Sequence, residues 1–314
     1  MSEARLPFRN EFSWSFSRAQ TFHSCRRRYW FRYYAAWGGW MPTAPEESRQ
    51  LYLLSKMRNL PMLVGTIVHS TLEHQLVRMR DAWLPQDPVR EVRQRFEEAW
   101  RDSAARRHRE VGPKSAPPLF EHHYGIHVPS ARVEAMRERA ERSVRNVLAS
   151  ELYAQILAAG VSHWQAIEDV DTFRIDGVPV FVSPDFVFER EGQLWLVDWK
   201  TGRARRDMPL QLQLYALWAQ RIRGWTPDRI RAVDYFVADD EVHEVPVDAE
   251  LLRGLQTRIS RSIGRMREVL IDPEQNLTRA EDHPGTKDET ECGGCFFWEV
   301  CTVRRGPGPG ANAG

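Results

Sequence analysis

The spacing of apolar residues predicts helices in the first half of the chain. Between Phe12 and Tyr34, serines that can cap a helix are followed by mixed aromatic and arginine residues, and we predict a helix there. A second helix is expected to start near Gly65. His69, Leu72 and Leu76 follow at offsets of three and four, which places them on one side of that helix.

The pattern then separates a helical region from a β-rich region. Residues 85–162 are rich in arginine and glutamate with helical spacing, and we interpret them as an inserted helical subdomain. Residues 172–182 and 186–188 are β-rich, and 194–200 form an apolar run after a possible turn at 190–193, which predicts a hairpin that ends in a buried strand. Further on we expect a helix at 210–222, strands at 233–237 and 242–245, and a long amphipathic helix at 251–270.

Composition places the chain among ordinary globular proteins rather than disordered or fibrous ones. Of its 314 residues, 42% are hydrophobic and 28% are charged, and the net charge is +1. This balance excludes a uniformly basic nucleic-acid coat but is compatible with a local basic groove. No run approaches the ~18 apolar residues of a membrane span, and the N-terminal residues lack the apolar core of a secretory signal. We therefore expect a cytoplasmic protein.

The predicted strand at 194–200 carries two charged residues on one face. Alternate side chains of a strand share a face, so Asp198 and Lys200 project together, away from Trp199. Asp185, on the other arm of the hairpin, can reach the same place. Convergent carboxylates favour a divalent cation, and Mg²⁺ or Mn²⁺ suits an oxygen-lined site. The alternative is an ordinary surface ion pair at a sheet edge, since an Asp-x-Lys tripeptide is frequent by chance.

Two further observations favour the functional reading of this strand. Lys200 is one of four lysines in a chain that otherwise uses arginine, which suggests that a compact ammonium is required there. Downstream, Gln211 and Tyr215 lie four residues apart and share a helix face. Taken alone, that pair is more simply a solvated glutamine and a core tyrosine.

Together these motifs resemble the PD-(D/E)XK nuclease superfamily. The matching residues are Asp185, Asp198-x-Lys200-Thr201-Gly202 and Gln211-x-x-x-Tyr215, with Gly65-x-x-x-His69 upstream. This combination is similar to the RecB-like branch, which includes the RecB and AddB nuclease domains and the CRISPR-associated RecB-like exonucleases. The resemblance implies an α/β fold with a restriction-endonuclease-like core, in which helices flank a mixed central sheet.

The resemblance also implies roles for these residues. His69, Asp185, Asp198 and the backbone carbonyl of Trp199 would hold the divalent metal. Lys200 would position or activate the attacking water and stabilise charge on the scissile phosphate. Gln211 and Tyr215 would orient Lys200 or contact the nucleic-acid backbone, and Glu73 is a possible second partner of the metal-binding histidine.

The four cysteines form a separate candidate site. Cys292-x2-Cys295-x5-Cys301 places three thiols within ten residues, and Cys25 is far away in sequence. Four thiolates can bind tetrahedral zinc or a 4Fe-4S cluster, although structural zinc usually takes two close pairs. Because the RecB-like branch frequently shows this one-plus-three arrangement, we favour a 4Fe-4S cluster over zinc or unrelated buried thiols. Such a cluster would clamp the N-terminal segment to the C-terminal one.

These inferences predict five regions along the chain. They are an N-terminal helical part of the nuclease domain (1–76), the inserted helical subdomain (77–165), the catalytic core (166–270), a cluster-binding segment (271–305) and a disordered tail (306–314).

The expected activity is metal-dependent degradation of single-stranded or end-exposed DNA in repair, recombination or defence. Arginines at 26–28, 32, 203, 205 and 206 could line a phosphate track, although such runs are often solvated surface. The chain has no G-x-x-x-x-G-K-[ST] motif, so a helicase or another partner would have to supply the strand. The alternatives are a nucleic-acid-binding module with a weak nuclease site, an endonuclease that trims ends in CRISPR adaptation, and a redox sensor.

Overall fold

The computed structural model describes residues 9–84, 86–202 and 209–310, and the chain divides into two compact units. The first unit combines the described parts of 1–59, 102–127 and 261–314, and the second combines 60–101 and 128–260. Each unit is therefore assembled from segments that are distant in sequence. No helix in the described ranges has both the length and the apolar character that a membrane crossing requires.

A five-stranded mixed sheet is the centre of the second unit. Its order is β2-β5-β6-β7-β8, in which only β6 and β7 run parallel. The strands are β2 (Trp164–Ile167), β5 (Phe186–Arg190), β6 (Gln193–Lys200), β7 (Ile230–Phe236) and β8 (Glu241–Val245). A separate hairpin pairs β3 (Asp171–Ile175) with β4 (Val178–Val182). The predicted α/β class and mixed sheet are confirmed.

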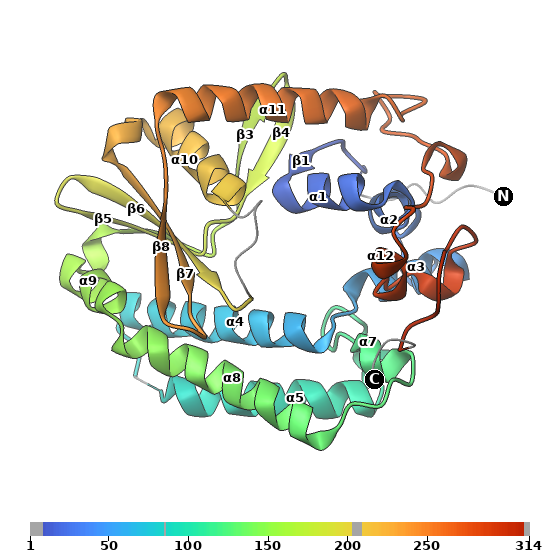
Figure 1. Cartoon of the computed structure of the whole chain (residues 1–314), viewed down its shortest axis with the longest axis horizontal. Coiled ribbons are helices and arrows are strands. Elements are labelled where there is room, and N and C mark those ends of the chain that lie inside the picture. Colours follow the sequence, from blue (N-terminus) through green and yellow to red (C-terminus); the bar gives the residue numbers. More distant parts are fainter. Residues whose placement is uncertain (1–8, 85, 203–208, 311–314) are drawn as a thin grey trace. The chain divides into compact units, whose positions relative to one another are not determined.

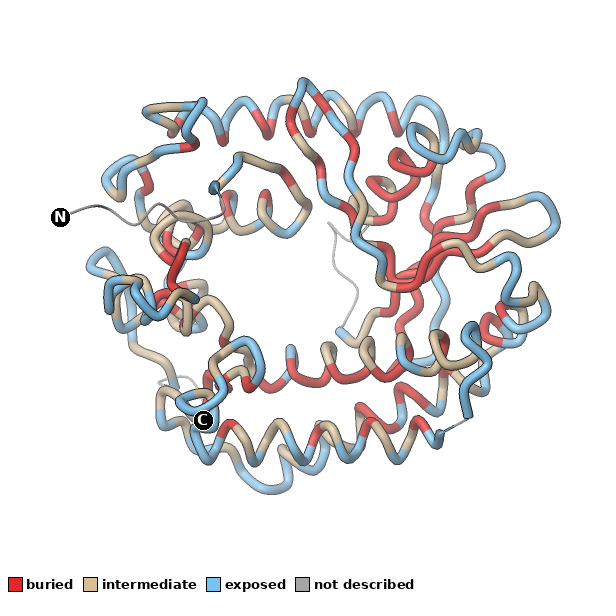
Figure 2. The backbone as a smooth tube through the Cα atoms, turned by 180° about the vertical axis from the view of Figure 1, so that it is seen from behind, coloured by how far each residue is buried: buried red, intermediate tan, exposed pale blue. Residues whose placement is uncertain are grey.

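The hairpin of β5 and β6 forms where the sequence predicts it. Arg190 pairs with Gln193, and the two residues between them, Glu191 and Gly192, have φ angles of 53° and 72°. Positive φ at both central positions is the two-residue turn whose twist matches that of a hairpin. β6 is buried along nearly its whole length, as Figure 2 shows for the central strands. A strand buried on both faces reads as a continuous apolar run, which is what the sequence has there.

Helices surround this sheet within the second unit. α10 (Pro209–Arg223) connects β6 to β7, as a parallel pair requires, while α4 (Leu60–Arg80) and α8 (Ser130–Ala149) lie side by side (Figure 1). The unit also contains α5 (Pro88–Ala104, which extends into the first unit), α9 (Glu151–Ala159) and α11 (Ala249–Arg267, likewise). Two short 3-10 helices, η2 (Val161–His163) and η3 (Pro227–Arg229), precede β2 and β7. The helix expected from Gly65 begins five residues earlier, at Leu60.

The first unit contains a broken helix where one continuous helix was predicted. After the short strand β1 (Trp14–Ser15), α1 (Phe16–Ser24) ends, Cys25 is extended, and α2 (Arg26–Trp30) continues into the π-helix η1 (Phe31–Ala35). Cys25 has φ −158° and ψ 111°, and its sulfur accepts from the backbone N–H of Arg28. The prediction of an unbroken helix from Phe12 to Tyr34 was wrong because this cysteine caps both helices.

The other elements of the first unit are short. They are α3 (Glu46–Lys56), α6 (His108–Val111), α7 (Phe120–His123), η4 (Ala280–Asp282), α12 (Glu289–Gly293) and η5 (Trp298–Val300). The region predicted as an insertion supplies elements to both units, since 102–127 belongs to the first and α8 and α9 to the second. Of the predicted tail, 306–310 is described and contains turns, and 311–314 lies outside the described residues.

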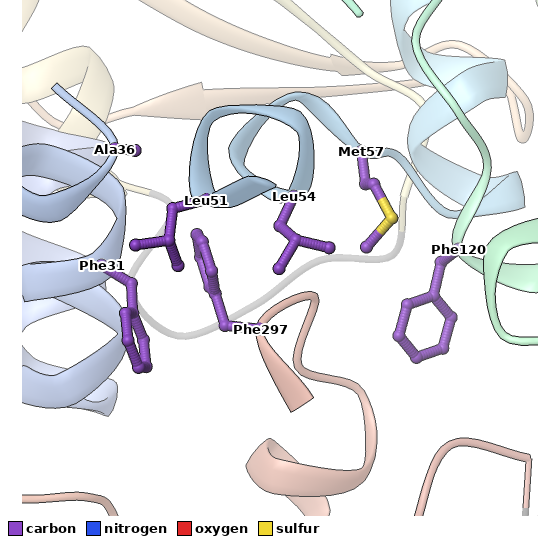
Figure 3. Close-up of a cluster of buried hydrophobic side chains, with 7 residues drawn as sticks. All are labelled: Phe31, Ala36, Leu51, Leu54, Met57, Phe120 and Phe297. Carbon is purple, nitrogen blue, oxygen red and sulfur yellow. The ribbon is translucent and has the colours of Figure 1, made fainter. Parts of the chain in front are cut away.

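One cluster of buried side chains joins the distant segments of the first unit. Figure 3 shows Phe297, from the C-terminal segment, between Phe31 and residues of α3. The rings of Phe31 and Phe297 are stacked with centroids 5.3 Å apart, and Phe297 is 2% exposed. Burial of such large rings against one another is among the strongest packing contributions available to a small core.

We expect Phe297→Ala to destabilise the protein by about 3–5 kcal/mol, because it leaves a cavity in this cluster. Urea unfolding monitored by circular dichroism measures the loss. Phe181→Ala is the control, since Phe181 is 41% exposed on β4, and it should change stability by less than about 0.5 kcal/mol. Equal losses in the two variants would contradict the assigned role of the cluster.

Candidate metal and phosphodiester site

The end of β6 places two oppositely charged side chains together in a buried position. Asp198 is 2% exposed, and its Oδ2 forms an ion pair with Nζ of Lys200. Between them, Trp199 is directed to the other face, where its ring packs against Tyr235 with centroids 5.9 Å apart. The other oxygen of Asp198, Oδ1, is buried without a hydrogen-bond partner among the described residues.

Asp185 reaches the same strand from the residue that precedes β5. Phe186 pairs with Val197, which carries Asp185 toward the end of β6. Its Oδ2 accepts a hydrogen bond of 2.7 Å from the backbone N–H of Trp199. Burial, followed by the charge of Asp198, raises the pKa of Asp185 to about 7.

His69 approaches from α4 and contacts the carbonyl group of the same residue, Trp199. Its Nε2 lies 2.7 Å from the carbonyl oxygen of Trp199, and its Nδ1 lies 3.4 Å from Oδ2 of Asp185. Burial alone would lower the pKa of His69, but the carboxylates of Asp185 and Glu168 outweigh burial and raise this pKa well above its ordinary value. Both peptide groups of Trp199 are thus used by residues of the site.

Glu168 is a member of this site that the sequence reasoning missed. It directly follows β2, has a φ of 52°, and its Oε1 lies 3.1 Å from Nδ1 of His69. Its backbone N–H donates to the carbonyl of Asp185, which ties it to the hairpin. The sequence feature that could have identified it is a short, mainly apolar run, Trp164 to Ile167, followed by acidic residues. Among the described residues, His69 is paired with Glu168 rather than with Glu73.

The geometry of these groups fits a divalent cation. One ligand atom each from His69, Glu168 and Asp185 lies within 4.8 Å of the others. Carboxylate oxygens suit Mg²⁺ and Mn²⁺, and imidazole nitrogen is a ligand of transition-metal ions. A cation would also relieve the repulsion that, after burial, raises the pKa of Asp185. Asp198 is outside that group of three, and one of its oxygens pairs with Lys200. Its Oδ1, without a partner among the described residues, is a further available donor.

A chain of hydrogen bonds orients Lys200. Its Nζ donates to Oε1 of Gln211 at 3.1 Å, and Nε2 of Gln211 donates to the hydroxyl of Tyr215 at 2.7 Å. That hydroxyl in turn donates to the carbonyl of Ser183 at 2.8 Å. The polar residues that share one face of α10 therefore connect the ammonium to the segment just before Asp185.

Asp234 is the second acidic residue that sequence reasoning missed. The parallel register of β6 and β7 pairs Asp234 with Asp198, and its Oδ1 lies 3.6 Å from Nζ of Lys200. It is 3% exposed, and burial, which outweighs the nearby ammonium, raises its pKa to about 6. A single aspartate in a strand that is otherwise mainly apolar was the available signal.

Two helices, α8 and α4, approach the backbone at the ends of β6 and β7. Arg139 of α8 donates to the carbonyl of Thr201 at 2.9 Å, and Asn146 donates to the carbonyl of Val237 at 2.9 Å. On α4, a Cβ added to Gly65 would lie 3.1 Å from Oγ1 of Thr201. The glycine one helical turn before His69 therefore allows α4 to approach the end of β6 closely.

The four cysteines come together in the first unit. They line one cavity, with Cys25 at the helix break, Cys292 in α12, and Cys295 and Cys301 in the following turns. All four are free thiols, and Cys295 and Cys301 pack against the aromatic cluster of Phe297. Burial raises the pKa of Cys295 to about 12. Four convergent thiols fit a metal centre, because thiolates are metal ligands and a bound cation offsets the cost that burial places on the deprotonation of Cys295 and Cys301.

The buried carboxyl of Asp185 predicts a pH-dependent stability. Its raised pKa means that the metal-free fold favours the protonated form, so its contribution to stability falls as pH rises from about 4 to 7. In EDTA at pH 8, Asp185→Asn should be more stable than wild type by about 1 kcal/mol or more, with a smaller difference at pH 5. Mn²⁺ should stabilise wild type more than the variant. Urea unfolding of both proteins at both pH values measures the stability difference between variant and wild type. If the advantage of the variant were smaller at pH 8 than at pH 5, the argument would be refuted.

One of the comparisons with known proteins identifies a family. A family model described as the PD-(D/E)XK nuclease superfamily matches residues 13–302. No curated protein matches the sequence. A solved structure, described as the crystal structure of SSO0001, is 14% identical, with a TM-score of 0.30, and the similarity covers 78% of this chain and 96% of that one. The mixed α/β architecture is consistent with the restriction-endonuclease-like fold of the matched family. On the strength of the family model, the chain belongs to the PD-(D/E)XK nuclease superfamily.

Proposed function

We propose that the protein is a metal-dependent deoxyribonuclease of the RecB-like branch, and specifically an exonuclease on single-stranded or end-exposed DNA. The observation that carries this proposal is the His69, Glu168 and Asp185 group beside the paired Asp198 and Lys200. Members of the superfamily are nucleases that use divalent metals. The Gly65-x-x-x-His69 and Gln211-x-x-x-Tyr215 elements support the RecB-like branch.

The proposed metal ligands are side chains already held in place by the backbone of β6. His69, Asp185 and Glu168 would bind Mg²⁺ or Mn²⁺, with the carbonyl of Trp199 and Oδ1 of Asp198 as further donors. When bound, a divalent ion polarises the phosphoryl oxygen and lowers the pKa of water. The hydrogen bond from Trp199 N–H holds Asp185 in the orientation that this role requires.

Lys200 would act as a fixed positive charge toward the scissile phosphate. Burial alone would lower the pKa of Lys200, but Asp198, Asp234 and Asp185 outweigh burial and raise it. An ammonium that stays protonated is suited to stabilise charge that develops on a non-bridging oxygen and to orient the attacking water. Gln211 holds the ammonium in place, and Tyr215 holds Gln211.

We also propose that Cys25, Cys292, Cys295 and Cys301 hold a 4Fe-4S cluster with a structural role. Three thiols from the C-terminal segment and one from the helix break share a cavity in the first unit. When bound, the cluster would supply covalent links between segments that are otherwise joined by packing around Phe297. The expected partners are DNA and a helicase or CRISPR adaptation protein that supplies the strand, and the expected location is the cytoplasm.

Removal of the ammonium tests the nuclease assignment. Lys200→Ala should lower cleavage of end-labelled DNA by at least ~10²-fold in Mg²⁺ or Mn²⁺, because a pre-organised charge at the phosphate is lost. Lys114→Ala, at an exposed lysine of the other unit, should cleave like wild type. Single- and double-stranded substrates, labelled at either end or internally, distinguish exonuclease from end-trimming endonuclease.

Two outcomes of this assay would count against the assignment. Full activity of Lys200→Ala would show that the site lies elsewhere. Wild-type inactivity on every DNA would favour the alternative of a nucleic-acid-binding module whose nuclease site is weak.

The proposed cluster has a direct spectroscopic signature. Anaerobically purified protein should absorb broadly near ~400 nm, as cysteine-ligated iron-sulfur centres do, and Cys301→Ser should lose that absorption. Iron and sulfide analysis of the same samples gives the stoichiometry. A colourless protein that contains one zinc per chain would contradict the cluster and support a zinc centre.

A further inference from the structure

A groove in the first unit is lined by residues from three separate segments. They come from the junction of α1 and α2, from the last turn of α11, and from the loop at 284–286. The groove encloses about 580 Å³ of empty space, which includes space open to solvent. None of the ligand candidates of the second unit, such as His69 or Asp185, belongs to it.

The charged residues of this groove are all basic. Arg26, Arg265 and His23 line it, and no aspartate or glutamate does. Within the described part of the chain, no carboxylate oxygen lies within 4.0 Å of the guanidinium nitrogens of Arg26 or Arg265. The neighbouring Arg28 differs, because its Nη1 forms an ion pair of 2.8 Å with Glu291. The positive charge of Arg26 is therefore not neutralised by a carboxylate of the described residues, and its guanidinium can bind an external anion.

The groove is fixed by packing rather than formed by loose side chains. The guanidinium of Arg26 lies 4.9 Å from the ring centroid of Phe22, which is 2% exposed. The backbone N–H of Arg27 donates to the carbonyl of Pro284 at 3.1 Å, which ties the loop to α2. A Cβ added to Gly285 would lie 2.9 Å from Cγ2 of Val303, so this loop is closely packed from behind.

We propose that this groove binds the backbone phosphates of a nucleic-acid strand. Guanidinium groups present parallel N–H donors that match phosphate oxygens, and a guanidinium held by packing, such as that of Arg26, loses little freedom on binding. The net charge of the chain is only +1, so attraction of a polyanion requires a local concentration of this kind. The inference rests on the proposed function in one respect, namely that the polyanion is a strand of DNA.

The groove shares a wall with the four-cysteine cavity. Cys25, Gly285 and Thr286 line both. Cysteine variants would therefore change both places at once, and the arginines are the appropriate positions for a test. Of the arginines expected to line a phosphate track, those at 203, 205 and 206 lie outside the described residues.

The test is equilibrium binding of fluorescein-labelled single-stranded DNA to the full chain in EDTA, followed by anisotropy over a series of salt concentrations. A strand of about 20 nucleotides exceeds the ~4–16 that single-strand-binding folds cover. Arg26→Gln with Arg265→Gln should weaken binding and make the slope of log K against log salt shallower by about 1.4, since each phosphate neutralised on a single strand contributes ~0.7. Arg265→Gln alone, at an exposed side chain that does not threaten the fold, should change the slope by about 0.7.

The matched control is Arg49→Gln with Arg109→Gln, two exposed arginines of the first unit without an acidic partner among the described residues. This pair removes the same charge and should keep the wild-type slope. An unchanged slope in both groove variants, or an equal change in the control, would overturn the proposal. Displacement of the strand by inorganic phosphate at fixed ionic strength would also overturn it, in favour of a small-anion site. EDTA prevents cleavage, so this binding assay does not depend on nuclease activity. A protein that binds the strand here but cleaves no DNA in the metal-containing assay would contradict the proposed function and leave the groove proposal intact.

Discussion

The accumulation of buried negative charge at the end of β6 is the constraint on which the site depends. Four carboxylates, those of Glu168, Asp185, Asp198 and Asp234, face two basic groups, His69 and Lys200. With every group ionised, four negative and two positive charges leave an excess of two negative charges, which is the charge that one divalent ion would balance. Without such an ion, burial and mutual repulsion shift the balance toward protonation of Asp185 and Asp234. Placing these carboxylates close together is unfavourable, and the surrounding backbone fixes each group in its position despite the unfavourable free energy.

That backbone is held from several directions within the second unit. The register of β5 with β6 positions Asp185, and the parallel register of β6 with β7 positions Asp234. α4 can approach because Gly65 has no side chain, and α8 caps the ends of β6 and β7 through Arg139 and Asn146. α8, which comes from the region predicted as an inserted helical subdomain, thus supports the strand that carries Asp198 and Lys200. Rigid elements of this kind are the supports that precise metal and phosphate chemistry requires.

Sequence reasoning reached the features whose spacing is local. Strand alternation placed Asp198 and Lys200 on one face, and helical spacing placed Gln211 beside Tyr215, because both rules act within a few residues. Glu168 and Asp234 were missed because their place depends on strand pairing between segments far apart in sequence. The helix break at Cys25 was missed for another reason. Its flanking residues favour helix, and only the cap made by the cysteine sulfur identifies the boundary.

The backbone and the side chain of Trp199 have different roles. Its indole packs in the core, while its amide N–H and its carbonyl face Asp185 and His69. Every residue except proline carries that same N–H and C=O pair. Evolution is therefore free to exchange the side chain at this position for others of similar volume without altering the polar groups offered to the site. Sequence variability at position 199 would then be a poor guide to its importance, and imino acids alone would be excluded there on chemical grounds.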